Sequence, residues 1–175
     1  MFGGHIGVAI GAFGLRQTVP LWLLIIASQL PDWADATLCL ANARPVVPGM
    51  LSHSVPAVIV LAGVAAAVAY AMSRDVASSG LVALVVASHY VGDYFTGIKP
   101  TWPGGPMVGL ELYRQPALDF LLESAVIALG WTIYRRSFPP ERRSSREVVA
   151  VLVVLVMVQL AGDIFFSLAP GLKKC

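Results

Sequence analysis

The sequence predicts an all-α, polytopic membrane helical bundle, with four long transmembrane helices preceded by a short N-terminal helical hairpin. Of its 175 residues, 57% are hydrophobic and 13% are charged, whereas about 25% are charged in an ordinary soluble domain. The mean hydropathy is +0.76. Four stretches contain about 20 apolar residues each, enough to cross a hydrocarbon core about 30 Å thick. No Ser/Gly-rich linker divides the chain, so residues 1–175 are expected to form a single integral-membrane domain.

The first apolar segments are too short to span a membrane alone. Residues 2–15 and 20–31 are apolar and are separated by Arg16 and Pro20. Two undersized helices must be packed against protein, because lipid cannot satisfy exposed backbone polar groups. These segments therefore predict a hairpin that re-enters the bundle. Residues 32–51, rich in proline near their end, predict a loop.

The four long apolar stretches follow. They predict transmembrane helices at residues 53–72, 78–97, 115–134 and 147–168. The connection at 99–115 contains Trp-Pro-Gly-Gly-Pro, which primarily predicts a tight loop. A substrate lid is the second interpretation.

Five arginines lie between residues 135 and 146, and basic loops remain on the cytoplasmic side. Helix alternation then places both termini and the loops at 32–52 and 99–114 outside. This threading puts seven basic residues inside and five outside. The expected location is the bacterial inner membrane, with multiple spans.

The charge and the cysteine content argue against a nucleic-acid-binding protein and against a disulfide-stabilised fold. The net charge of +2 is concentrated in one loop, so no nucleic-acid binding is expected. Cys39 and Cys175 form neither a CxxC pair nor a disulfide framework.

The ionisable residues carry the functional signal. The predicted threading places all three histidines and seven of the ten acidic residues near one membrane face, the outer one. An ionisable residue within a membrane helix costs about 2.5 to 3.5 kcal/mol on insertion scales, so such residues are retained for a function. The sharpest local pattern is His89-x-x-x-Asp93, which puts an imidazole and a carboxylate on one helix face. These residues predict a divalent-metal site.

The ligand types limit the metal and the chemistry. Imidazole and carboxylate ligands suit zinc, and also manganese or iron. Catalysis additionally needs an open coordination position and a substrate pocket. Ser52 and Ser54 flank His53 and are expected to orient its ring, while Arg114 or Lys99 is expected to pair with an anionic group such as a phosphate.

Structural interpretations of several residues stay open. His5 also fits a surface histidine, and Asp32 and Asp35 beside Pro31 also fit a helix cap or stop.

The remaining acidic residues within predicted helices favour supporting roles. Asp119 and Glu123 are four residues apart and fit a structural pair or an outer ring of the site. Asp163 with Gln159 fits a polar contact between helices.

An ordered set of motifs resembles a known family. The motifs are His5, Leu30-Pro31-Asp32 with Asp35, Ser52-His53-Ser54, His89-Tyr90-Val91-Gly92-Asp93 continuing to Gly97, and Trp102-Pro103. Over residues 3–135 the chain resembles the bacterial membrane-bound metal-dependent hydrolases, the YdjM-like proteins. That family is in turn similar to zinc-dependent phospholipase C and single-strand nucleases. The resemblance implies five metal ligands and one further candidate: His5, Asp32, His53, His89 and Asp93, with Asp35. One departure is Leu51, the residue before Ser-His-Ser, where many relatives carry a basic residue and Thr.

Together these observations predict a membrane-bound metal-dependent hydrolase. The expected substrate is a phosphoester of a lipid or lipid-linked molecule, and the expected partners are membrane lipids. Asp32 or Asp35 is expected to accept the proton of the attacking water, and Arg114 to hold the phosphate oxygens. The assignment of hydrolysis, as opposed to metal binding alone, rests on the family resemblance. A cation transporter and a structural membrane protein with a metal staple are the alternatives.

Overall fold

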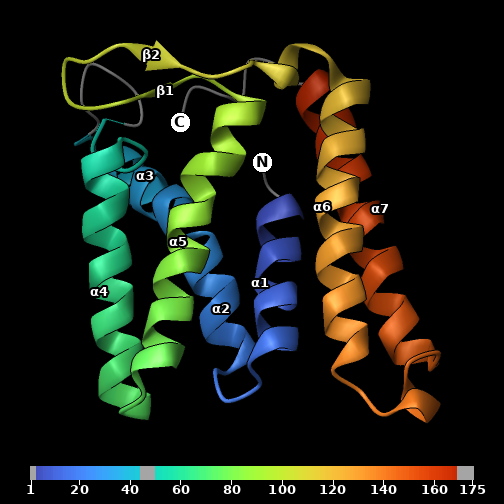
Figure 1. Cartoon of the computed structure of the whole chain (residues 1–175). Helices are drawn as coiled ribbons and strands as arrows, with labels where there is room; N and C mark the ends of the chain where they lie inside the picture. Colours follow the sequence, from blue (N-terminus) through green and yellow to red (C-terminus); the bar gives the residue numbers. More distant parts are fainter. Residues whose placement is uncertain (1–2, 44–49, 169–175) are drawn as a thin grey trace.

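The structure, a computed structural model, describes residues 3–43 and 50–168 and confirms the all-α membrane bundle. These residues form seven α-helices, whose arrangement is drawn in Figure 1. They are α1 (Gly3–Leu15), α2 (Leu21–Ser28), α3 (Leu30–Leu40), α4 (Val55–Ser73), α5 (Val76–Thr96), α6 (Pro116–Arg136) and α7 (Arg146–Leu168).

Four of these helices, α4 to α7, are long and apolar enough to cross a membrane. Each begins and ends within two residues of its predicted bounds. Local chemistry explains two of the starts, because the Ser54 side chain accepts a hydrogen bond from the Ala57 amide and the Asp75 side chain accepts one from the Ser78 amide. α6 begins at Pro116, where a missing N–H costs nothing.

The prediction of a loop over residues 32–51 is wrong for its first part. Residues Leu30–Leu40 form α3, and the expected single segment at 20–31 breaks at Gln29 into α2 and α3. Pro31 is tolerated because it lies in the first turn, where its missing N–H has no helical partner. The following Ala- and Leu-containing residues are compatible with a helix. Residues 44–49 of the predicted loop, and Cys175, lie outside the described residues.

The connection between α5 and α6 contains a little regular structure. Strands β1 (Lys99–Pro100) and β2 (Met107–Val108) pair antiparallel, and a 3-10 helix, η1 (Leu112–Arg114), precedes α6. Another 3-10 helix, η2 (Pro140–Arg142), lies between α6 and α7.

The short N-terminal hairpin lies inside the bundle, as expected for helices too short to span the membrane. Figure 1 shows α1 between the α4–α5 and α6–α7 pairs. α1 packs most extensively on α6, where glycines allow the backbones to approach. A Cβ atom at Gly7 would lie 2.8 Å from the Ile127 Cα, and one at Gly14 would lie 2.7 Å from the Tyr134 Cα. Any larger residue at these positions would separate the two helices.

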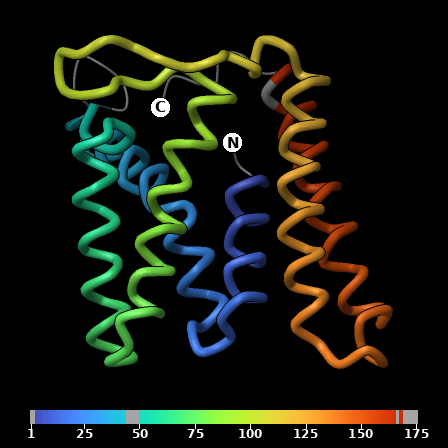
Figure 2. The backbone as a smooth tube through the Cα atoms, viewed as in Figure 1, coloured from blue at the N-terminus to red at the C-terminus, as the bar shows by residue number. Residues whose placement is uncertain are grey.

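The two ends of the bundle differ. One end contains α3, the β1–β2 pair and the first residues of α4 and α6, and α1 begins deeper in the bundle, with its first residues directed toward that end (Figure 2). The turns joining α1 to α2 and α4 to α5, and the connection from α6 to α7, lie at the opposite end. The arginine-rich connection therefore lies at the end opposite α3.

Candidate metal centre

His89 and Asp93 are one helical turn apart on α5, and both are buried. The His89 Nδ1–H donates a hydrogen bond of 2.8 Å to the carbonyl oxygen of Ser28, the last residue of α2. Because a carbonyl only accepts, this bond fixes the ring tautomer and leaves the lone pair of the neutral ring on Nε2. His89 Nε2 lies 3.5 Å from Asp93 Oδ2 and 3.6 Å from Asp32 Oδ1.

His53 reaches the same point from the residue before the cap of α4. Its Nε2 atom lies 3.0 Å from Asp32 Oδ1 and 3.4 Å from Asp93 Oδ2. The other ring nitrogen, Nδ1, lies 2.8 Å from the Ser52 hydroxyl, which donates to Asp35 Oδ1 at 3.4 Å. Since the Ser52 proton is directed to Asp35, Ser52 accepts the Nδ1–H of His53, and Nε2 is again the free nitrogen. Asp35 thus orients His53 through Ser52.

Four side chains therefore converge with their ligand atoms facing one another. One atom from each lies within 4.8 Å of the others, and the four are Asp32, His53, His89 and Asp93. Ligands about 2.0 to 2.2 Å from a tetrahedral ion lie about 3.3 to 3.6 Å apart. The nitrogen–oxygen distances between the histidines and the aspartates here, 3.0 to 3.6 Å, are close to those ligand–ligand distances. The donor set and its spacing fit a divalent ion such as zinc.

His5 lies beside this group, at the start of α1. It is 1% exposed, so the surface interpretation is wrong. Its ring stacks on His89 with centroids 3.7 Å apart, and its Nε2 lies 3.4 Å from Asp93 Oδ1. His5 therefore orients Asp93 and His89, but it is not one of the four residues whose ligand atoms lie within 4.8 Å of one another.

The cluster opens to the exterior on one side. The Asp32 side chain is 45% exposed, while those of His53, His89 and Asp93 are almost fully buried. Partial burial favours a raised pKa for Asp32, but hydrogen bonds that His53 and His89 donate when both ring nitrogens carry a proton outweigh it and hold the pKa well below its usual range. Asp32 is therefore a carboxylate, the form that binds metal, at the accessible edge of the site.

Two cationic residues were expected near an anionic substrate, and the structure places only one of them at the cluster. The Lys99 ammonium, carried by β1, lies 3.0 Å from Asp93 Oδ2. Arg114 pairs with Glu111 at 3.0 Å instead, and its side chain is 77% exposed.

Two polar side chains, Glu123 on α6 and Gln159 on α7, hold the first turn of α1. Glu123 Oε2 accepts a hydrogen bond of 3.0 Å from the Gly4 amide, and Gln159 Oε1 accepts one of 2.9 Å from the Gly3 amide. Gln159 also donates to Asp163 at 2.8 Å. These bonds satisfy amides that a helix start leaves unpaired, and they fix the turn that carries His5. Asp119 lies buried one turn before Glu123 on α6. Glu123 therefore has the expected supporting role, and Gln159 makes the expected polar contact between helices.

Sequence reasoning missed two contributors. The Ser28 carbonyl gives no side-chain signal, because it is exposed to His89 only by the break between α2 and α3. The capping by Glu123 and Gln159 joins residues more than 100 positions apart. Their placement within apolar helices was the only available indication.

The comparison with known families agrees with this arrangement. The family model described as YdjM inner membrane protein matches residues 1–166. The chain belongs to the YdjM inner membrane protein family. No curated protein and no solved structure matches it. The match and the four apolar helices make this YdjM protein an inner-membrane protein with transmembrane helices. The distant relation to zinc-dependent phospholipase C and nucleases stays an inference from the motifs.

Proposed function

We propose that this YdjM protein is a metal-dependent hydrolase acting on a phosphoester of a membrane lipid or lipid-linked molecule. The observation that carries the proposal is the convergence of two imidazole Nε2 atoms and two carboxylates on one point. Hydrogen bonds donated by their Nδ1–H groups aim both rings at that point. A divalent ion held there, zinc in the first instance and manganese or iron otherwise, would lower the pKa of a bound water to about 7 and polarise a phosphoryl oxygen.

The residues around this point have separate roles in the proposal. Asp32, charged and half-exposed, would accept the proton of the attacking water, while His53, His89 and Asp93 would hold the ion and leave its fourth position to that water. Asp35 acts through Ser52 to position His53. Lys99 supplies the positive charge for a phosphate oxygen, since it already lies beside Asp93. Arg114, the other expected phosphate ligand, is engaged with Glu111 and serves at most the outer part of the substrate.

The site belongs to the outer face of the membrane in this proposal. The centre lies at the end of the bundle that contains α3, and the arginine-rich connection lies at the other end. Basic connections remain cytoplasmic, which directs the centre outward.

The geometry favours a hydrolase over a transporter. Below the centre, the described residues that line a cavity between α1, α5 and α6 are all apolar. A transported cation would need polar groups along its path. A purely structural ion, in turn, would not require a half-exposed carboxylate such as Asp32 beside it.

The test is metal content measured by elemental mass spectrometry on the full chain purified in mild detergent. We expect at least one transition-metal ion per chain in the wild type and its loss in the His53→Ala/His89→Ala double variant. Glu111→Gln, which removes an acid paired with Arg114, is the control and should retain the ion. No ion in the wild type after addition of zinc and manganese would refute the proposal. A bound ion without phosphate release from lipid phosphates would leave a structural role.

A further inference from the structure

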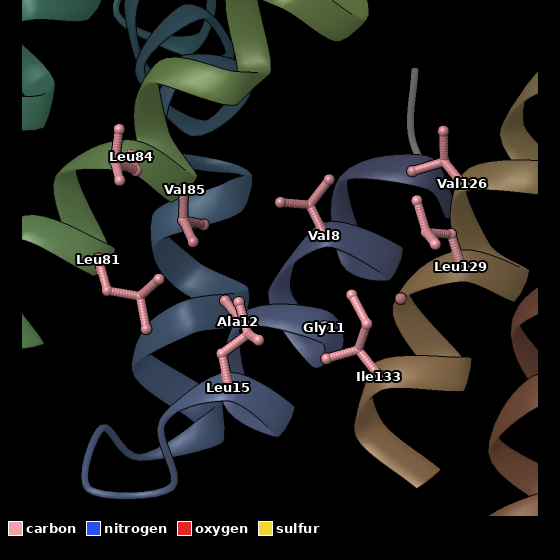
Figure 3. Close-up of a pocket in the computed structure, with 11 residues that line it drawn as sticks. Val8, Gly11, Ala12, Leu15, Leu81, Leu84, Val85, Val126, Leu129 and Ile133 are labelled. Carbon is pink, nitrogen blue, oxygen red and sulfur yellow. The ribbon is translucent and has the colours of Figure 1, made fainter. Parts of the chain in front are cut away.

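An apolar groove lies below the metal centre, between α1, α5 and α6. Its volume is about 260 Å³. Figure 3 shows Leu81 and Val85 of α5 on one side and Val126 and Leu129 of α6 on the other, with α1 between them. No polar or charged residue is among the described residues that line it. The groove therefore suits a hydrocarbon occupant.

Two helices of the groove, α1 and α5, lead toward the metal centre. Val8 follows His5 by three residues on α1, and Val85 precedes His89 by four on α5. Residues three or four apart share a helix face. On both helices the groove face therefore becomes, one turn later, the face that carries the metal centre.

The length of this surface matches a lipid chain. Ten residues separate His5 from Leu15 at the far end of the groove, which is about 15 Å along the helix axis. Half of a hydrocarbon core about 30 Å thick is also about 15 Å, the depth that the chains of one leaflet fill. An amphiphile with its polar head at the centre would reach the end of the groove.

We infer that the groove binds an acyl chain of a membrane phospholipid whose phosphate lies at the metal centre, beside Lys99. The position of the phosphate rests on the proposed function, whereas the binding of the chain rests on the groove itself. The combination of an anion-attracting ammonium at one end and a purely apolar lining at the other is complementary to a phospholipid.

A transmembrane helix from another chain is a poorer occupant. Helices associate in membranes through small residues that allow close approach. The glycines here are already used, because a Cβ at Gly11 would lie 3.0 Å from the Gly130 Cα of the α1–α6 contact. The rims consist of Leu84 and Leu129, long side chains that are 68% and 64% exposed. Long flexible side chains fit a flexible chain better than a rigid helix.

The test uses phosphatidic acid with a diazirine in the middle of one acyl chain, added to the full-length protein in phosphatidylcholine nanodiscs. Photo-cross-links mapped by mass spectrometry should concentrate on residues 81–85 and 126–133. Leu129→Trp and, from the opposite rim, Leu84→Trp should lower this labelling by roughly tenfold, the effect of about two methylene groups losing their contacts. Leu121→Trp is the matched control on α6, with 61% exposure outside the groove, and should leave labelling unchanged.

The outcomes separate the groove from the hydrolase. Labelling spread evenly over all lipid-facing helices, or unaffected by both groove variants, would overturn the chain site even if phosphate is released. Groove labelling without phosphate release would support the chain site and contradict hydrolysis. Equal groove labelling by a diacylglycerol with the same diazirine chain would overturn the placement of the phosphate at the centre.

Discussion

At the residue scale, the two serines that flank His53 have different roles. The Ser52 hydroxyl joins His53 to Asp35, whereas Ser54 caps α4 and donates to the Met50 carbonyl. Ser52→Ala should weaken metal binding by about 10- to 100-fold, as is usual when a group that orients a ligand is removed. Titration of the apo-protein with zinc against a competing chelator measures this change.

Ser54→Ala is the matched control for that prediction. It should lower the free energy of unfolding by about 1 kcal/mol through loss of a helix cap, while zinc affinity stays at the wild-type value. Equal zinc affinities in the two variants would show that Ser52 does not orient His53.

Lys99 carries a second prediction at this scale. Its ammonium lies 3.0 Å from Asp93 Oδ2 and therefore opposes a divalent ion there. Lys99→Gln should strengthen zinc binding and raise the KM for a lipid phosphate by about tenfold, the size of one charge-assisted hydrogen bond. Lys99→Arg should restore the KM. A larger rise in KM from Arg114→Gln would assign the phosphate to Arg114 instead.

The sequence predicted the members of the site better than their roles. His89 and Asp93 were identifiable because ionisable residues within apolar helices are rare. Asp35 was predicted as a ligand or a base, and the structure places it behind Ser52. Sequence spacing does not show which of Lys99 and Arg114 reaches the centre, because the pairing of β1 with β2 and the turn of η1 decide it.

At the element scale, the close contact of α1 with α6 is the feature most sensitive to substitution. A Cβ at Gly130 would collide with the Gly7 carbonyl. Gly130→Ala should therefore destabilise the protein by about 1 to 3 kcal/mol, as overpacking does. Thermal unfolding in detergent measures the change. Gly63→Ala on α4 is the control, because its Cβ would meet nothing within 4 Å, and it should lose no stability.

The far end of the bundle contains a pH-sensitive contact between two turns. Asp75 accepts hydrogen bonds from Ser78 and from Arg16, which follows α1. Bonds from Ser78, together with the Arg16 guanidinium, lower the pKa of Asp75 from 3.8 to about 2. A carboxylate with a lowered pKa stabilises the fold above its unfolded-state pKa and loses this effect as the pH falls through its folded-state pKa.

Asp75→Asn should therefore unfold at a lower temperature than wild type near pH 6. The difference should shrink as the pH falls from about 4 to about 2, across the ordinary and the shifted pKa. Glu141→Gln, which removes an exposed carboxylate from the same end, controls for the loss of one charge. A difference that is independent of pH would indicate a steric effect of the amide.

Elements were predictable where one signal dominated. Length and hydropathy determine the long helices α4 to α7, because the bilayer sets the length of a span. The sequence does not predict α3, because Pro31 is typical of the start of a loop, although the first turn of a helix also accepts proline. The break at Gln29 has no comparable local signal, and it decides where the Ser28 carbonyl points.

At the scale of the whole molecule, the two ends of the bundle have separate roles. One end carries the candidate centre and its connections, and the other carries the turns and the arginines of residues 135–146. The convergence of ligands at one end required only that the helices alternate in direction. Which end faces the cytoplasm depends instead on the distribution of basic residues.

That orientation is testable with introduced cysteines in a Cys39→Ser/Cys175→Ser background. Met107 of β2 and Ser144 of the α6–α7 connection are both exposed, at opposite ends. A membrane-impermeant maleimide should label Met107→Cys in cells whose inner membrane is intact, and Ser144→Cys only after that membrane is lysed. The reverse pattern would place the centre at the cytoplasmic face. The ligands would still converge, but the phosphate-bearing substrate would then have to come from the inner leaflet.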